Sequence, residues 1–302
     1  MDVLIQARNL SIGYGSHKKE KEPPILSNVN LALPAGGIYG LVGANGQGKT
    51  TLLRALAGQL AVQGELRVFG QTPFDNAHVL DRTVFMGIDT ELPNRKVSQI
   101  FAMCASRWVN WSAELAQKLV EDFAVPMDKD YKELSRGQRS SVGFIIALAS
   151  GCPLVLLDEP YLGLDVEKQE KLYAALRNYR SSERTFIMAT HQLAQAQPIL
   201  DHIVLIDAGT VALSADISEL LGSIFEIRGT KKQVAAALSP IPSEFIVQET
   251  HIVSGSKALI DLRKGENLIP DLIQGAHESG AALREVTLEQ VITLMTGDSH
   301  DS

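Results

Sequence analysis

The stretch GANGQGKT at residues 43–50 matches the pattern G-x-x-x-x-G-K-[ST], which is typical of phosphate-binding loops. It follows the apolar run Ile38–Val42, which predicts a buried strand, and it begins a predicted helix that extends to Leu60. Glycines allow backbone amides to close around phosphates, and the helix N-terminus adds a favourable partial charge. We expect Lys49 to contact the β- and γ-phosphates and the Thr50 hydroxyl to contact Mg²⁺. A chance glycine-rich turn is the alternative, but the position between a strand and a helix favours phosphate binding.

A second candidate group follows the apolar run Leu154–Leu157, which ends in the two carboxylates Asp158 and Glu159. Strand ends in an open α/β sheet face the crevice in which ligands bind. One carboxylate can hold a Mg²⁺ complex, and the next can polarise a water molecule in line with the γ-phosphate. Many strands end in acidic residues, so this pattern is weak alone. Together with the phosphate loop it becomes a strong indication of a nucleotide site.

Length and composition indicate a globular chain of about two domains. The chain has 302 residues and a formal charge of −7, with no basic excess before or after residue 222. Proteins that follow a phosphate backbone usually carry such an excess, so nucleic acid is not expected as a partner. The two cysteines, Cys104 and Cys152, are too few for a disulfide framework, which indicates a reducing cytosol. We expect neither a signal peptide nor a membrane span, which needs roughly 20 apolar residues.

Three further motifs surround the acidic strand end. Leu134-Ser135-Arg136-Gly137-Gln138 precedes it, Gly163-Leu164-Asp165 follows it, and Thr190-His191 comes after another predicted strand. Together with the phosphate loop, this order resembles the ATP-binding cassette (ABC) ATPases over about residues 1–215. The stretch around Trp108 and Trp111 also resembles bacterial single-cassette proteins that export drugs or peptides, although core packing is the other interpretation of these aromatics. The resemblance implies an α/β fold of the P-loop NTPase class, of the ABC ATPase type, with a helical signature subdomain.

The resemblance also implies ATP and Mg²⁺ as cofactors and a role for each motif residue. Glu159 would be the general base, and His191 would contact the γ-phosphate, so both are catalytic candidates. Ser135 and Gly137 would approach the ATP of a second subunit, in a head-to-tail dimer with two ATP molecules at its interface. The implied nucleotide-binding residues are Tyr14 (stacked on adenine), Gly43, Asn45, Gly46, Gly48, Lys49, Thr50, Thr51, Ser135, Gly137, Gln138 and Asp165. The implied metal ligands are Thr50, Asp89 and Asp158.

Three positions depart from the pattern of this family. Arg136 stands where the signature often has Gly, and Tyr161 stands where Ser or Thr is common after Glu-Pro. Asp89 occupies the position of the glutamine that gives the Q-loop its name. We expect Asp89 to keep a role facing Mg²⁺ or water, with a plain surface position as the alternative. Gly137 is retained, and we expect that a side chain there would keep the backbone away from the phosphate.

The pattern of the chain changes after Gly222. Strand-like and helix-like runs alternate there, and they predict a small α+β domain of a size that can fold alone. The predicted strands are Ile224–Arg228, Phe245–Val247 and Ala258–Leu262, and the predicted helices are Lys231–Leu238, Leu268–Ser279 and Leu288–Met295. We therefore expect an ABC nucleotide-binding domain over residues 1–222 and an accessory or regulatory domain over residues 223–302.

The function that these motifs favour is ATP hydrolysis by a subunit of an ABC transporter. We expect the chain to drive a separately encoded membrane permease, in the export direction, through ATP-dependent dimerisation with a second ABC subunit. Such a chain would be cytoplasmic and held at the inner face of the cell membrane by the permease. A soluble ABC ATPase acting on ribosomes or DNA is the alternative, but the chain has one cassette and no extended heptads. A degenerate module without hydrolysis is disfavoured because Lys49, Asp158, Glu159 and His191 are all present.

Overall fold

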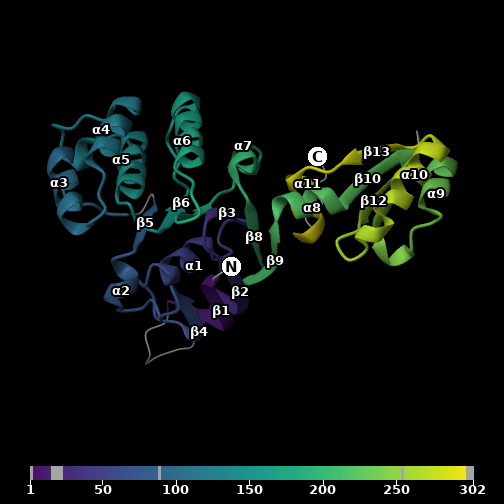
Figure 1. Ribbon diagram of the computed structural model, residues 1–302, viewed down its shortest axis with the longest axis horizontal. Helices are drawn as coiled ribbons and strands as arrows, with labels where there is room; N and C mark the ends of the chain where they lie inside the picture. Colours follow the sequence, from purple (N-terminus) through teal and green to yellow (C-terminus); the bar gives the residue numbers. More distant parts are fainter. Residues whose placement is uncertain (1–2, 15–22, 88–89, 253–254, 297–302) are drawn as a thin grey trace. The chain divides into compact units, whose positions relative to one another are not determined.

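The computed structural model describes residues 3–14, 23–87, 90–252 and 255–296, so Asp89 lies outside the described residues. The chain divides into two compact units, Met1–Ser214 and Ala215–Ser302 (Figure 1). The sequence indicates a change at Gly222, which falls inside helix α8 (Ile217–Ser223). Helix α8 packs against β10 (Ile224–Gly229), which is the first strand of the C-terminal unit. This helix therefore belongs with the second unit.

The first unit is built around a six-stranded sheet with the order β5-β6-β7-β3-β8-β9. Its strands are β3 (Gly37–Val42), β5 (Thr83–Gly87), β6 (Leu154–Asp158), β7 (Thr185–Ala189), β8 (His202–Asp207) and β9 (Thr210–Asp216). The pairs from β5 to β8 are parallel, as the alternation of predicted strands and helices indicates. Asp158 at the end of β6 pairs with Ala189 at the end of β7. The residues that follow these two strands therefore meet at one edge of the sheet.

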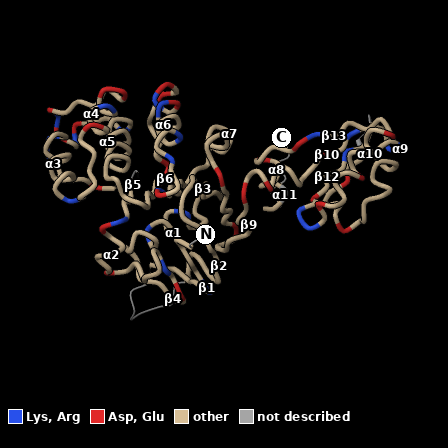
Figure 2. The backbone as a smooth tube through the Cα atoms, in the orientation of Figure 1, with Lys and Arg blue, Asp and Glu red and all other residues tan. Residues whose placement is uncertain are grey.

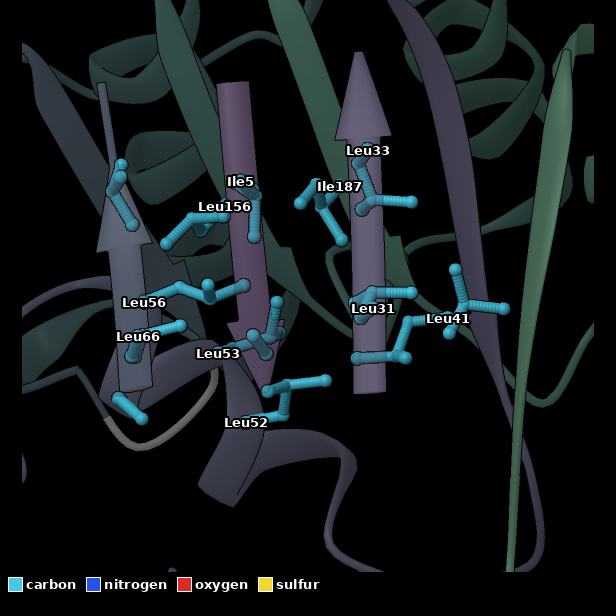
Figure 3. Close-up of a cluster of buried hydrophobic side chains, with 14 of the residues drawn as sticks. Ile5, Leu31, Leu33, Leu41, Leu52, Leu53, Leu56, Leu66, Leu156 and Ile187 are labelled. Atoms are coloured by element: carbon cyan, nitrogen blue, oxygen red, sulfur yellow. The ribbon is translucent and has the colours of Figure 1, made fainter. Parts of the chain in front are cut away.

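A second, antiparallel sheet has the order β2-β1-β4, and helix α1 (Lys49–Leu56) shares one core with both sheets. Its strands are β1 (Val3–Ile12), β2 (Leu26–Pro34) and β4 (Gln63–Val68). Leucine side chains of α1 lie between side chains from both sheets (Figure 3). Each buried leucine contributes roughly 1.5–3 kcal/mol to folding, so this packing holds the start of α1 firmly. The helix ends before the predicted Leu60 because Gly58 adopts a left-handed conformation, with φ +71°.

A helical subdomain contains α3 (Val97–Arg107), α4 (Ala113–Asp122) and α5 (Arg136–Ala149). Both α3 and α4 pack against α5, which in turn packs against β5 and β6 (Figure 1). Helix α5 begins directly after Ser135, which caps it. The remaining helices of this unit are α2 (Ala77–Leu80), α6 (Val166–Asn178) and α7 (Leu193–Ala196), with short 3₁₀ turns at Tyr131–Glu133 and Gln197–Ile199.

The second unit is a small α+β structure with an antiparallel sheet of order β11-β12-β10-β13. Its elements after β10 are α9 (Lys231–Leu238), β11 (Ile246–Ile252), β12 (Gly255–Asp261), α10 (Ile269–Ser279), β13 (Ala282–Glu285) and α11 (Leu288–Thr296), with 3₁₀ turns at Ser243–Phe245 and Glu266–Leu268. Its core brings together Ile227, Val234, Ile260 and Leu272. The sequence analysis misses β13, because this strand is short and mostly exposed and so has little apolar alternation.

Charged residues of both signs are interspersed along the described chain in each unit (Figure 2). Within the described residues, none of the helices combines the length and the apolar composition that a bilayer crossing requires.

Candidate nucleotide-binding and hydrolysis site

The phosphate loop connects the end of β3 to the start of α1, as its sequence predicts. Gly43 has φ +147°, and a Cβ atom at this residue would lie 2.3 Å from the carbonyl oxygen of Ile206. Strand β8 therefore leaves no room for a side chain at the first glycine of the motif. The loop residues Asn45 and Gly46 are exposed, whereas Gly48 is buried at the start of the helix.

The Lys49 side chain lies along this loop and is largely buried. Its Nζ atom donates hydrogen bonds to the carbonyl oxygens of Gly43 at 2.8 Å and Ala44 at 3.0 Å. Burial lowers the pKa of this ammonium group, and the nearby charges of Glu159 and Asp158 oppose the shift. The loop thus has one cation held close to its backbone, where phosphate oxygens would lie.

Thr50 and Asp158 form a hydroxyl–carboxylate pair beside the loop. The Thr50 hydroxyl donates to Oδ2 of Asp158 at 2.7 Å. Burial raises the pKa of Asp158, while the hydrogen bond from Thr50 opposes that shift. Hydroxyl and carboxylate oxygens are ligands suited to Mg²⁺, which proteins usually hold through one or two carboxylates and the substrate phosphates. Among the described residues, no group of three or more His, Cys, Asp or Glu side chains could hold a metal ion.

Glu159 and His191 follow the adjacent strands β6 and β7, and their side chains meet. Oε2 of Glu159 lies 2.7 Å from Nδ1 of His191. The backbone of Glu159 has φ +51°, an uncommon value for a residue other than glycine, and its N–H donates to the carbonyl oxygen of Ala189 at 3.1 Å. The side chain of Glu159 is only 14% exposed, whereas that of His191 is 47% exposed. A shielded carboxylate is thus joined to a more accessible imidazole.

Tyr161 is the functional candidate that the sequence analysis records only as a departure from the family pattern. Its side chain is completely buried, and its hydroxyl contacts both Glu159 and His191. The available signal was its place two residues after Glu159, in a short turn between β6 and α6. The sequence alone did not indicate that the ring turns inward.

The start of α5 carries the signature residues. Ser135 is its N-cap: the Ser135 hydroxyl accepts from the N–H of Gln138 at 3.2 Å, and the Gln138 side chain accepts from the N–H of Ser135 at 3.0 Å. A Cβ atom at Gly137 would lie 2.1 Å from the carbonyl oxygen of Gly163. The glycine is thus required by packing within the chain, a reason that the sequence analysis did not consider. In the described part of the chain, no hydrogen bond joins these signature residues to the phosphate loop.

Three other predicted site residues, Tyr14, Thr51 and Asp165, have local partners. The Tyr14 hydroxyl lies 3.3 Å from Oγ1 of Thr51 and accepts from Arg54 at 3.4 Å, so the half-exposed tyrosine stands beside α1. Asp165 caps α6 by accepting from the N–H of Lys168 at 2.9 Å. Asp89, the remaining metal candidate, falls outside the described residues.

A cavity of about 470 Å³ lies between the end of β5, the start of α5 and the Glu159-Pro160 segment. Its walls mix apolar residues such as Met86 and Phe144 with two arginines, Arg136 and Arg139. None of its lining residues belongs to the phosphate loop. The cavity therefore borders Glu159 from the side of the helical subdomain.

Known proteins share both this sequence pattern and this fold. The family model described as "ABC transporter" matches residues 26–162. The daunorubicin resistance ATP-binding protein DrrA3 of Streptomyces coeruleorubidus is 25% identical over 299 residues, which cover 94% of this chain and 95% of that protein. The zinc transport system ATP-binding protein TroB of Treponema pallidum is 27% identical over 71% of this chain and 82% of its own. A solved structure of the ATP-binding subunit of an ABC transporter is 21% identical and superposes with a TM-score of 0.62, covering 72% of this chain and 91% of the other.

A phosphate loop at the end of one parallel strand, with acidic residues at the end of another strand of the same sheet, is typical of a P-loop ATPase. Among P-loop ATPases, the relatives point to the ATP-binding subunits of ABC transporters. They also confirm the predicted α/β fold of the ABC ATPase type. The chain matches the ABC transporter family over residues 26–162 and is similar to its ATP-binding subunits, which indicates an ABC-type ATPase that hydrolyses ATP.

Proposed function

We propose that this subunit powers an exporter, with a separately encoded permease in the membrane and a second ABC subunit beside it. The observation that carries the proposal is one cluster at the carboxyl ends of β3, β6 and β7. This cluster contains Lys49, Thr50, Asp158, Glu159 and His191. Its cation, its hydroxyl–carboxylate pair and its Glu–His pair are the groups that phosphoryl transfer to water requires.

Lys49 would balance the charge of the β- and γ-phosphates, and the backbone amides of the loop would bind their oxygens. Thr50 and Asp158 would hold Mg²⁺, since their oxygens already lie 2.7 Å apart beside the loop. When bound, Mg²⁺ supplies positive charge between the phosphate oxygens. Tyr14, half-exposed next to α1, offers a ring on which adenine can stack.

Glu159 would accept a proton from the attacking water, because its carboxylate is shielded and held at a strand end beside the loop. The 47% exposed His191 would contact the γ-phosphate and keep the attack geometry. General-base catalysis typically contributes roughly 10²–10⁴-fold to a rate, so Glu159 is the side chain that the reaction depends on most.

The signature residues support a head-to-tail dimer. Ser135 is exposed at the N-terminus of α5, and this helix end has a partial positive charge that favours a phosphate. Within the described chain, Ser135 and Gln138 bind each other and not the phosphate loop. A second subunit in the opposite orientation would supply the nucleotide that this helix end contacts, and Asp165 would lie at the same interface.

The export direction is supported by the extent of one match. The daunorubicin resistance protein aligns over 94% of the chain, a span that includes most of the C-terminal unit, whereas the zinc transport protein aligns over 71%. The Nod factor export protein of Cupriavidus metallidurans is 28% identical over 74% of this chain. Most of the C-terminal unit thus aligns with a resistance protein, which favours export.

Affinity capture from detergent-solubilised membranes of the native host tests this function. The bait is the Glu159→Gln variant with ATP, which should keep the assembled state. Recovery of a polytopic permease at a stoichiometric level is the expected result. Recovery of ribosomes or DNA in its place would contradict the transporter assignment.

A further inference from the structure

Tyr161 lies at the centre of the hydrogen bonds that link the ends of β6 and β7. Its ring is 0% exposed and packs edge-on against the His191 ring, with centroids 5.6 Å apart. Its hydroxyl contacts Oε2 of Glu159, the hydroxyl of Thr190 at 3.1 Å and the backbone N–H of His191 at 3.0 Å. One oxygen atom therefore contacts the proposed base and the backbone of the proposed switch histidine.

The chemistry of these partners assigns each hydrogen bond. An ionised carboxylate can only accept, so the single Tyr161 proton is donated to Glu159. The two lone pairs of the Tyr161 oxygen then accept from the Thr190 hydroxyl and from the His191 N–H. The Tyr161 oxygen also lies 3.2 Å from Nδ1 of His191, so this one oxygen contacts the side chains of both Glu159 and His191. Burial, together with the bond to Glu159, raises the pKa of Tyr161.

The same reasoning assigns the proton on the His191 ring. Nδ1 lies 2.7 Å from Oε2 of Glu159, which can only accept, so Nδ1 must carry a hydrogen. Oε2 thus accepts from both Tyr161 and His191 and is fixed between them. In the described chain, no hydrogen bond to the other carboxylate oxygen, Oε1, accompanies these two, so Oε1 would be the oxygen that accepts from a water molecule.

We propose that Tyr161 is a positioning residue, whose hydroxyl fixes Glu159 and His191 in one arrangement before the chemical step. The proposal rests on the proposed roles of those two side chains in hydrolysis. A Ser or Thr, common at this position in the family, carries its hydroxyl on Cβ. It would not reach these atoms from the same backbone position, so this chain fixes the pair in its own way.

The first test is Tyr161→Phe, measured as kcat and KM for ATP. A hydrogen bond to a charged group typically corresponds to roughly ten-fold or more, so we expect kcat to fall by about ten-fold and KM to change by less than about two-fold. The matched control is Tyr173→Phe on α6: this tyrosine is also buried, and the described residues offer its hydroxyl no partner. Wild-type kcat in Tyr161→Phe, or an equal loss in Tyr173→Phe, would overturn the proposal.

A double-mutant cycle with His191→Ala separates positioning from a general loss of stability. If the hydroxyl acts through the Glu159–His191 pair, Tyr161→Phe should cost less than about two-fold once His191 is gone, because coupled residues are not additive. Equal costs in both backgrounds would overturn the proposal. If Tyr161→Phe fails to fold, Thr190→Val decides the question, since it removes one partner of the hydroxyl. We then expect a fall in kcat of roughly three-fold, and an unchanged kcat would count against the proposal.

The Glu159→Gln variant distinguishes this inference from the proposed function beneath it. Normal hydrolysis by Glu159→Gln would remove Glu159 from the mechanism, and both proposals would fail. Loss of hydrolysis in Glu159→Gln with normal hydrolysis in Tyr161→Phe would leave the proposed function standing and reject only the role of Tyr161.

Discussion

Helices α5 and α9 begin with the same local structure in the two units of the molecule. Ser135 and Gln138 form a capping box at α5, and Thr230 and Gln233 form one at α9. The distances agree closely, with the side chain of the third helical residue accepting from the N-cap N–H at 3.0 Å in α5 and 2.9 Å in α9. Such boxes satisfy backbone N–H groups that a helix start leaves free, whatever the helix does.

What differs is the residue at the second helical position and its neighbours. In α5 this residue is Gly137, which lies directly against the backbone of Gly163, and Ser140 donates to the carbonyl of Leu162 at 2.6 Å. In α9 the same position is the exposed Lys232. The start of α5 is therefore joined to the turn that follows Glu159, whereas the start of α9 is joined through the Gln233 side chain to the carbonyl of Gly280 at 3.1 Å, within the second unit. A capping box becomes part of a functional site through what it packs against.

The largest expected effect is on the reaction that the start of α5 is proposed to serve. We expect Glu159→Gln to lower ATP turnover by roughly 10²–10⁴-fold, because the amide cannot accept the proton of water. ATP binding, measured with a fluorescent analogue, should remain. Turnover close to that of the wild type would exclude Glu159 as the general base. The turn that α5 contacts would then have no proposed role in hydrolysis, and α5 would not differ from α9 in function.

The next effect comes from placing alanine at the second position of each helix. In Gly137→Ala, the new Cβ would lie 2.1 Å from the Gly163 oxygen, so α5 and the turn must move apart. A displacement of about 1 Å can cost a hundred-fold in rate, and we expect a fall in turnover of that order. Lys232→Ala in α9 is the matched control and should keep wild-type turnover. Equal turnover in the two variants would contradict the role of the Gly137–Gly163 contact.

Removing the N-cap side chain should lower the stability of the protein by a similar amount in α5 and in α9, but it should lower ATP turnover only in α5. We expect Ser135→Ala and Thr230→Ala each to lower the free energy of unfolding by about 1 kcal/mol, as for other N-cap residues. Denaturant unfolding of each variant measures that change. Only Ser135→Ala should also reduce ATP turnover, since only Ser135 is proposed to meet a nucleotide. A similar loss of turnover in Thr230→Ala would mean that the effect comes through stability.

The smallest effect concerns Asp89, which lies outside the described residues and so has no counterpart in the comparison of α5 with α9. Ionised Asp only accepts hydrogen bonds, whereas Gln both donates and accepts. If Asp89 faces the metal, Asp89→Ala should raise the Mg²⁺ concentration needed for half-maximal turnover, and Asp89→Gln should partly restore it. Identical Mg²⁺ titration curves for the wild type and both variants would make Asp89 a surface residue.

The parts of the site that lie on consecutive residues were predictable from sequence. The apolar strand, the glycine loop and the helix that begins at Lys49 are encoded locally, and the structure has them in that order. The meeting of Glu159 and His191 needed one further step, because parallel strands bring their carboxyl ends to one edge. Sequence order was sufficient for the first, whereas the second also depends on β6 and β7 being neighbours in the sheet.

Contacts between residues distant in sequence were not predictable. From the sequence, a glycine at position 137 is expected to allow phosphate approach, and the structure gives a separate reason for it, because the Gly163 carbonyl lies there. Tyr161 stood out only as an unusual residue, since the inward turn of its ring depends on the packing of two strand ends. Strand β13 was missed for the opposite reason, as its exposed residues lack the alternation that marks a strand.

Light scattering of the Glu159→Gln variant, with and without ATP, measures most directly whether the start of α5 in one chain completes the nucleotide site of another. The chain has a mass of 32.8 kDa. With ATP we expect a stable species of about twice that mass, and Gly137→Ala in the same background should return it to one chain. A Glu159→Gln variant that binds ATP and remains a single chain would contradict the proposed dimer.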